Sequence, residues 1–363
     1  MGIVIALALI VIFAAYHLYR FTRPVPPPLV LPRPQLPAHV PLVSFLVPAW
    51  NDGRHIPEFV AHYHQLSYPH KELILCVGGQ DGSWEIAKSL AAEDVQVTQQ
   101  KAGEGKQVAL RHSYPLASGD IIYLTDIDCR LNDDTVNNLL DTMLTKGYSA
   151  VTGSSRPLDS QTDIPFVQVQ WAIDQEVAPK TVSLTTGILG RNAAASRAAL
   201  GAVGAFDEDV PAGTDYFLAK KLIKSEISIW YIPGYPMPSE YPGTVPIYIH
   251  KQARWIRNVF VLGRQFHNQQ EVQSAFKTLM LPIITGLLIL GSLVLGSMGA
   301  TIFWPVATLA LLVILQSYLN RELYLKHAKV HQSSMVVTIL HWYADTVAAL
   351  TAGWQILRKR LVW

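Results

Sequence analysis

The pattern of hydrophobic and polar positions separates two apolar ends from a mixed middle section. Residues 2–19, 279–298, 301–319 and 335–357 are predominantly apolar, and each stretch is about as long as a bilayer-spanning helix. Between residues 42 and 268 the apolar positions instead recur in short runs separated by polar segments. The chain is therefore predicted to carry membrane helices at both ends and a globular domain between them.

Charged residues beside the apolar stretches predict how these stretches are oriented. Arg20 and Arg23 follow the first stretch and only Met1 precedes it, which is typical of an uncleaved anchor rather than a signal peptide. We therefore expect the amino terminus outside and the middle section in the cytoplasm. The last stretch contains His341 and Asp345, which are costly in lipid, so it is predicted to be a third C-terminal span or an interfacial or re-entrant helix.

Within the middle section, runs typical of strands alternate with segments of helical spacing. Strands are predicted at residues 43–48, 72–77, 95–99, 121–124, 150–154, 186–189 and 227–232. Helices are predicted at residues 56–65, 84–92, 106–117 and 215–223. Such alternation is typical of the α/β class, in which a mostly parallel sheet has helices on both faces.

These patterns predict the organisation of the whole chain. It comprises an N-terminal transmembrane anchor at 1–22, a Pro-rich linker at 23–41, an α/β domain at 42–268 and a C-terminal membrane region at 269–363. The prolines of the linker exclude regular helix or sheet and favour a stiff extended chain. The net charge of only +2 gives no sign of a nucleic-acid-binding surface.

The most informative polar positions are Asp126 and Asp128, which end the apolar run at 121–124. In an extended backbone, residues two apart face the same way, so both carboxylates are expected on one side. A divalent cation such as Mg²⁺ or Mn²⁺ relieves the repulsion between them, and such ions commonly arrive with phosphates. The pair therefore predicts a metal-diphosphate site at the carboxyl end of a strand, although a simple polar turn has the same sequence pattern.

Five further segments place polar or glycine residues where strands end or helices begin. They are residues 47–52, 78–83, 103–106, 213–216 and 251–255. Each has a plain structural explanation: a turn, a helix cap or, for the last segment, a basic flank at the membrane interface. Each also suits a binding loop, because helix amino termini direct backbone N–H groups at anionic ligands.

In order and spacing, these segments resemble the membrane-bound family 2 glycosyltransferases, which have a GT-A (Rossmann-like) fold and invert the anomeric centre. The opening motif Val-Pro-Ala-Tyr-Asn-Glu appears as residues 47–52, and Asp-x-Asp as 126–128. The motif Thr-Asp appears as 214–215, and Gln-x-x-Arg-Trp as 251–255. The stretch 214–220 is most similar to the ceramide-glucosyltransferase-like subgroup. The resemblance assigns residues 42–268 as a GT-A glycosyltransferase domain.

The resemblance also implies a role for each matching residue. It implies Asp215 as catalytic base, Arg254 as a cation beside the diphosphate and Trp255 as a wall of the acceptor site. Binding of the nucleotide sugar is assigned to Pro48, Ala49, Trp50, Asp52, Asp81, Lys106 and Asp126. The metal, Mg²⁺ or Mn²⁺, is assigned to Asp126 and Asp128. Contacts in the acceptor region are assigned to Gly190, Asn192, Thr214, Lys251 and Gln252.

The sequence departs from the family pattern at two places. Lys251 stands where the closing motif has Gln, although the ceramide-glucosyltransferase-like members accept a basic residue there. The aspartate that usually reads the nucleotide base falls on Cys76 or Val77, which leaves Asp81 as the fallback candidate. Cys76 and Cys129 are expected to be reduced core residues, because the domain is predicted to face the cytosol.

The expected function is metal-dependent, inverting transfer of a hexose from a nucleotide-diphosphate sugar to a membrane lipid. A UDP-sugar is expected in preference to a GDP-sugar. The lipid acceptor is expected because apolar segments tether the domain to the cytoplasmic face of a membrane, here the bacterial inner membrane. Alternatives are a processive polysaccharide synthase, a polyprenyl-phosphate glycosyltransferase and a non-catalytic scaffold on a decayed transferase fold.

Overall fold

The computed structural model describes residues 1–25, 33–210, 212–330 and 334–358. The described chain divides into two compact units. One, which we call the sheet unit, consists mainly of Leu29–Gln161 and Ala178–Tyr241. The other, the helical unit, consists of Met1–Pro28, Thr162–Val177 and Pro242–Arg360.

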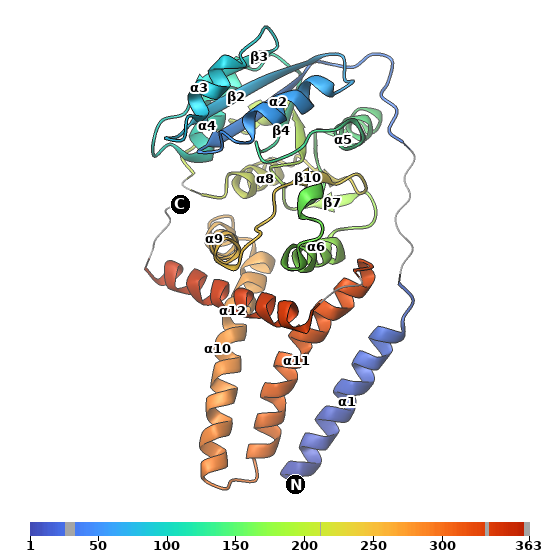
Figure 1. Cartoon of the computed structure of the whole chain (residues 1–363), viewed down its shortest axis with the longest axis vertical. Coiled ribbons are helices and arrows are strands. Elements are labelled where there is room, and N and C mark those ends of the chain that lie inside the picture. The colour runs from blue at the N-terminus through green and yellow to red at the C-terminus, as the bar shows by residue number, and fades with distance from the viewer. Residues whose placement is uncertain (26–32, 211, 331–333, 359–363) are drawn as a thin grey trace. The chain divides into compact units, whose positions relative to one another are not determined.

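The sheet unit is built around one large mixed sheet (Figure 1). Its strands are β1 (Val43–Trp50), β2 (Lys71–Gly78), β3 (Val95–Gln99), β4 (Ile121–Leu124), β5 (Ala150–Thr152), β7 (Ser183–Thr185), β8 (Ala193–Ser196) and β9 (Ile229–Tyr231). Among the described residues they pair in the order β3-β2-β1-β4-β8-β5-β9-β7. The β3-β2-β1-β4 half is parallel, whereas β8 runs antiparallel to β4 and β5. The α/β class predicted from the sequence is therefore confirmed.

Helices and a small second sheet complete this unit. The helices are α2 (Ile56–Gln65), α3 (Ser83–Ser89), α4 (Gly105–Ser113), α5 (Asp133–Lys146), α7 (Arg197–Ala202) and α8 (Thr214–Lys224). Short 3₁₀ turns cover Tyr114–Leu116 and Asp159–Gln161, and β6 (Ser155–Pro157) pairs in parallel with β10 (Met237–Ser239). Because β1, β2 and β4 are parallel, the loops that follow them meet at one edge of the sheet, where open α/β sheets bind ligands.

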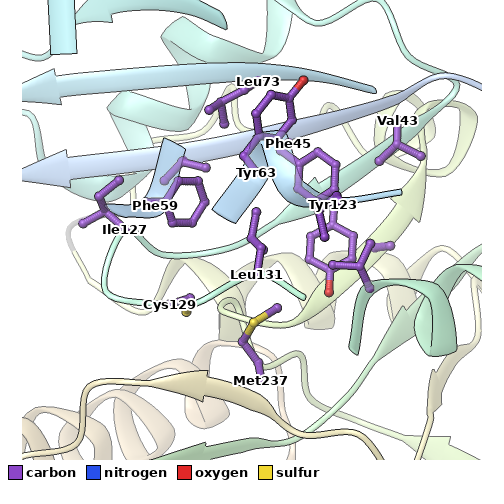
Figure 2. Close-up of a cluster of buried hydrophobic side chains, with 14 of the residues drawn as sticks. Val43, Phe45, Phe59, Tyr63, Leu73, Tyr123, Ile127, Cys129, Leu131 and Met237 are labelled. Atoms are coloured by element: carbon purple, nitrogen blue, oxygen red, sulfur yellow. The ribbon is translucent and has the colours of Figure 1, made fainter. Parts of the chain in front are cut away.

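Alternate side chains of the central strands fill both faces of the large sheet. Phe45 of β1 stacks on Tyr123 of β4 with ring centroids 4.9 Å apart, and Tyr63 of α2 meets Phe45 edge-on. Figure 2 shows these rings within one buried cluster. Leu46 points to the opposite face and packs in the cluster that contains Leu110 of α4. Burial on both faces fixes β1 and β4, and with them the loops at their ends.

Most predicted elements of the sheet unit are present, and the exceptions have physical causes. The helix at 56–65 and the strands at 95–99 and 121–124 have the predicted bounds. The strand predicted at 186–189 is wrong, because β7 ends at Thr185 and the apolar residues after it form an irregular segment. Strand β8 was not predicted: its sequence Ala-Ala-Ala-Ser has low strand propensity, and its buried place between β4 and β5 overrides that preference.

The structure describes part of the predicted Pro-rich linker and both cysteines. Residues 24–25 and 33–41 contain neither helix nor strand. Residues 26–32 of the predicted linker, and 359–363 of the predicted C-terminal region, lie outside the described residues. Cys76 and Cys129 are both described, and both are buried free thiols.

The helical unit contains the candidate membrane segments. Its helices are α1 (Gly2–Thr22), α6 (Pro165–Val177), α9 (Val245–Gln265), α10 (Gln269–Ser297), α11 (Phe303–His327) and α12 (Met335–Leu357). Of the described helices, α1, α10, α11 and α12 are long and apolar enough to cross a membrane, which indicates a membrane protein. Helices α1 and α10 both pack on α11, whereas α12 packs most extensively on α9. Figure 1 shows α12 running across the direction of α10 and α11.

Polar groups within the helical unit are paired across helices. Asp345 of α12 forms an ion pair with Arg321 of α11 and accepts a hydrogen bond of 2.5 Å from the Tyr248 hydroxyl of α9. On α1, His17 hydrogen-bonds to the Gln316 side chain of α11 at 3.0 Å. Such pairing offsets the cost of placing charged and polar side chains among apolar helices. It explains how the apolar stretch at 335–357 accommodates an aspartate.

Candidate active site

Asp126 and Asp128 lie just beyond the carboxyl end of β4. The side chain of Ile127 between them is buried in the core, whereas both aspartates are partly exposed. Thr125 is buried, and its hydroxyl donates a 3.1 Å hydrogen bond to the Arg191 carbonyl oxygen, which attaches the end of β4 to the loop before β8. The alternation of burial places the two carboxylates away from the core, on the ligand-binding edge of the sheet.

The ammonium of Lys106 joins Asp126 to Asp215. Its Nζ donates a 2.8 Å hydrogen bond to Asp126 Oδ1 and lies 3.3 Å from Asp215 Oδ1. Lys106 is in the first turn of α4, and Asp215 is in the first turn of α8. Burial by itself lowers the pKa of Lys106, but the two carboxylates outweigh it and raise the pKa above its usual value. Residues far apart in the sequence thus form one charged cluster.

The segment before β8 closes the other side of Asp215. A Cβ atom on Gly190 would collide with the Asp215 carboxylate, so the glycine provides the space that this carboxylate occupies. Thr214 is buried, and its hydroxyl has no hydrogen-bond partner among the described residues. Asn192 is buried just before β8, where its side-chain amide accepts a hydrogen bond from the Tyr123 hydroxyl at 2.7 Å and donates one to the Ser154 carbonyl at 2.8 Å. Its visible role is to hold the segment that carries Gly190.

The loops after β1 and β2 are tied to each other. Asp81 accepts hydrogen bonds from the Gly53 backbone N–H at 3.0 Å and from the Ser83 hydroxyl at 2.5 Å. These bonds lower the pKa of Asp81, the hydrogen bond from Ser83 most of all. The Ser83 hydroxyl oxygen in turn accepts from the Asp52 backbone N–H at 3.1 Å. Asp81 therefore fixes the loop geometry at this edge.

Residues from the opening motif contribute differently to the site. Pro48 and Ala49 belong to β1, and Ala49 is buried. Trp50 is 37% exposed, and its indole lies so close to Gly78 that a Cβ there would clash with the ring. Burial and, next, the nearby charge of Asp128 raise the pKa of Asp52. The aromatic ring and the Asp52 carboxylate thus lie at the same sheet edge as the Asp-x-Asp pair.

The structure leaves no carboxylate at the position where the family reads the base. Cys76 and Val77 are fully buried within β2. Burial raises the pKa of the Cys76 thiol to about 12, so this side chain is a neutral core residue. The two residues that follow are Gly78 and Gly79, neither of which carries a side chain.

Arg191 is a site residue that was not selected from the sequence. It is partly exposed, and its Nη1 donates a 2.8 Å hydrogen bond to the Ser239 hydroxyl. Desolvation alone would lower its pKa, but the negative charges nearby, that of Asp128 most of all and that of Asp126, raise the pKa by more. The sequence signal that could have identified Arg191 was its basic side chain between Gly190 and Asn192, which were both assigned to the acceptor region. Arg191 supplies a fixed positive charge beside the Asp-x-Asp pair.

The closing motif lies on α9 in the helical unit. Ala253 is fully buried, Trp255 is 60% exposed, and Lys251, Gln252 and Arg254 are partly exposed. The apolar face of α9 is therefore buried, whereas the side chains of these polar residues and of Trp255 are at least partly accessible.

The donor set at Asp126 and Asp128 suits one kind of metal site. Among the described residues, no group of three or more His, Cys, Asp or Glu side chains is placed to hold a metal ion. Mg²⁺ and related ions are commonly bound through one or two carboxylates, with substrate phosphates and water completing the shell. The two aspartates therefore fit a cation that binds together with a diphosphate, rather than a permanent metal centre.

Comparison with solved structures identifies the fold class. The chain resembles the mannosyltransferase PcManGT from Pyrobaculum calidifontis, solved in complex with GDP-Man and Mn²⁺. The TM-score is 0.59 at 18% identity, over 99% of this chain and all of that one. This likeness, together with the mostly parallel sheet and its helices, defines a GT-A-like fold.

Sequence comparison gives the family. The chain belongs to the glycosyltransferases, because the family model described as Glycosyltransferase like family 2 matches residues 40–258, more than half of its length. It is also 28% identical over 116 residues to the glycosyltransferase GlyG of Streptococcus pneumoniae serotype 4 (strain ATCC BAA-334 / TIGR4). That match covers 31% of this chain and only 38% of the relative. The predicted family 2 glycosyltransferase membership and the GT-A fold are confirmed.

Proposed function

We propose that the protein transfers a hexose from a nucleotide-diphosphate sugar to a membrane lipid, with inversion and with the help of Mg²⁺ or Mn²⁺. The observation that carries this proposal is the cluster in which Lys106 contacts both Asp126 and Asp215. It brings the expected metal ligand and the expected base within reach of one another at the ligand-binding edge of the sheet. Membership of the glycosyltransferase family supports the same reaction class.

The proposed reaction requires positive charge that stabilises the departing diphosphate, and a base that takes the proton of the acceptor hydroxyl. When bound, the divalent cation would stabilise the charge that develops on the departing diphosphate. Asp126 and Asp128 would hold that cation, and Lys106 and Arg191 would add positive charge nearby. Asp215 would accept the proton of the acceptor hydroxyl at a carboxylate oxygen as this hydroxyl attacks the sugar. Direct displacement with inversion needs one such base, so a single aspartate is sufficient.

The roles of the closing motif and the nature of the acceptor are proposed from the family motif and the membrane segments. Arg254 and Trp255 on α9 would serve the leaving diphosphate and the acceptor, as in the Gln-x-x-Arg-Trp motif. The anchor at 1–22 and the membrane region at 269–363 would hold the catalytic domain, residues 42–268, at the cytoplasmic face of a bacterial inner membrane. A lipid of the type used by the ceramide-glucosyltransferase-like subgroup is the proposed acceptor.

A donor panel tests this proposal. The full-length protein is incubated with UDP- and GDP-sugars, Mn²⁺ and a total membrane lipid extract, and lipids are analysed by mass spectrometry. We expect one donor, a UDP-sugar, to be consumed and one lipid to gain the mass of a single hexose. A product ladder would indicate a processive synthase, and a polyprenyl-phosphate product the other alternative. If no donor is consumed in the presence of lipid and metal, the proposed activity is wrong.

A further inference from the structure

One ammonium occupies the position that links the expected metal ligand to the expected base. Lys106 Nζ contacts Asp126 Oδ1 at 2.8 Å and Asp215 Oδ1 at 3.3 Å, and the lysine side chain is only 19% exposed. Two carboxylates placed this near each other repel unless a cation lies between them. In the protein without donor, Lys106 is that cation.

We propose that Lys106 is a placeholder cation that holds Asp126 until the donor arrives and then transfers its contact to the donor diphosphate. This inference rests on the proposed function, because it assumes a donor with a diphosphate and a divalent cation. A divalent cation and the Lys106 ammonium compete for the same Asp126 carboxylate. The diphosphate offers Lys106 a stronger anionic partner, which leaves Asp126 to the metal and reduces the hold of Lys106 on Asp215. No covalent bond changes in this step.

The position of Lys106 suits such an exchange. The lysine side chain is a point charge on a flexible four-carbon stem, so its ammonium can move between partners without movement of the backbone. Lys106 lies in the first turn of α4, a helix of nine residues whose amino terminus favours an anion. A diphosphate that binds near Asp126 would therefore meet both the ammonium and the helix terminus.

The helix that carries Lys106 does not depend on Lys106 for its position. The adjacent Gln107 donates 3.0 Å hydrogen bonds to the carbonyl oxygens of Phe206 and Glu208. Arg111, one turn later, donates a further 3.0 Å hydrogen bond to the Phe206 carbonyl. These contacts attach α4 to the loop before α8, so the Lys106 contacts are available for a function other than holding the fold.

The exchange predicts that the binding of the metal and the binding of the nucleotide are coupled, and this coupling can be measured. While Lys106 covers Asp126, a divalent cation alone binds weakly. The nucleotide removes this competition, so each ligand strengthens the binding of the other by the same factor. Removing the ammonium should strengthen metal binding without nucleotide, weaken nucleotide binding and reduce the coupling factor. A lysine that only binds phosphate would affect nucleotide binding alone.

The test is a binding cycle on the full-length protein in detergent. Mn²⁺ binding is measured by electron paramagnetic resonance, with and without UDP or GDP, for wild type, Lys106→Met, Lys106→Arg and the control Lys101→Met. Lys101 is an exposed lysine of the loop before α4, so its substitution removes the same charge. For Lys106→Met we expect Mn²⁺ alone to bind about tenfold tighter and the coupling factor to fall about tenfold or more. Lys101→Met should retain the wild-type coupling, and Lys106→Arg, which keeps a positive charge beside Asp126, should bind Mn²⁺ alone no tighter than wild type.

The outcomes separate this inference from the proposed function. Suppose that wild type binds Mn²⁺ and nucleotide together, but Lys106→Met binds Mn²⁺ alone no tighter than wild type. This result overturns the placeholder role and leaves the proposed function intact. If wild type binds neither ligand, the proposed function itself fails. If Lys106→Met and Lys106→Gln both fail to fold while Lys106→Arg folds, Lys106 is a structural cation and the inference is also overturned.

Discussion

Substitution of Gly190 by alanine should impair the reaction while leaving the fold intact. The new Cβ atom would occupy the position of the Asp215 carboxylate, and the structure shows no positive φ at Gly190 that would strain an alanine backbone. The aspartate is a short side chain at a helix start, so it can rotate away at little cost in stability. To restore a normal van der Waals separation, the carboxylate must move by roughly 1 Å, a displacement that costs on the order of 100-fold in rate.

We therefore expect Gly190→Ala to lower the rate of sugar transfer about 100-fold, which corresponds to about 2.7 kcal/mol in activation free energy. The assay is the initial rate of lipid glycosylation at saturating donor, with donor affinity measured by calorimetry. Gly187→Ala is the matched control, because a Cβ at Gly187 meets nothing within 4 Å. Wild-type transfer by a correctly folded Gly190→Ala protein would refute the role assigned to the Asp215 position.

Three further predictions concern other parts of the molecule. Asp128→Ala should weaken Mn²⁺-dependent nucleotide binding at least about tenfold, measured by calorimetry with and without the metal, and equal binding in both conditions would contradict the metal site. Asp345→Asn should lower the free energy of unfolding by about 3 kcal/mol, seen as a lower melting temperature, because it leaves the Arg321 charge without its carboxylate. The Cys76 thiol, with its pKa raised to about 12 from an ordinary value of 9.0, should resist iodoacetamide at pH 9 in the folded protein and react after denaturation. Because the unfolded thiol loses its proton first, this group makes the fold less stable as pH rises above about 9, and labelling of the native protein at pH 9 would contradict its burial.

The parallel half of the fold was predictable because each of its strands carries its own signal. The runs at 43–48, 72–77 and 121–124 are mainly apolar, as expected of strands buried on both faces. The antiparallel half was harder to predict, because β8 owes its strand conformation to neighbours rather than to its alanine-rich sequence. Helix α5 was also missed, although an Asn132 cap and the spacing of its apolar residues define it.

The sequence could nominate candidate site residues one by one, but it could not give their geometry. Sequence order placed Lys106 at the start of the helix that follows β3 and Asp126 just after β4, so both were expected at the edge of the sheet where its parallel strands end. The contact between Lys106 and Asp215 depends on the return of the chain through β8 to α8, which no local pattern specifies. Likewise, the sequence could not indicate that Asp81 would accept hydrogen bonds from the Gly53 and Ser83 backbone, or that the charge of Arg191 would lie near that of Asp128.

The central claim is that Asp215 removes the proton from the acceptor during sugar transfer. Its most direct test is Asp215→Asn, which keeps the size of the side chain and removes its ability to accept a proton. Donor affinity in the presence of Mn²⁺ and the single-turnover rate of transfer to lipid are measured on the same preparation. The account predicts donor binding within about threefold of wild type and a loss of transfer of at least about 100-fold. Transfer at the wild-type rate by Asp215→Asn would contradict it.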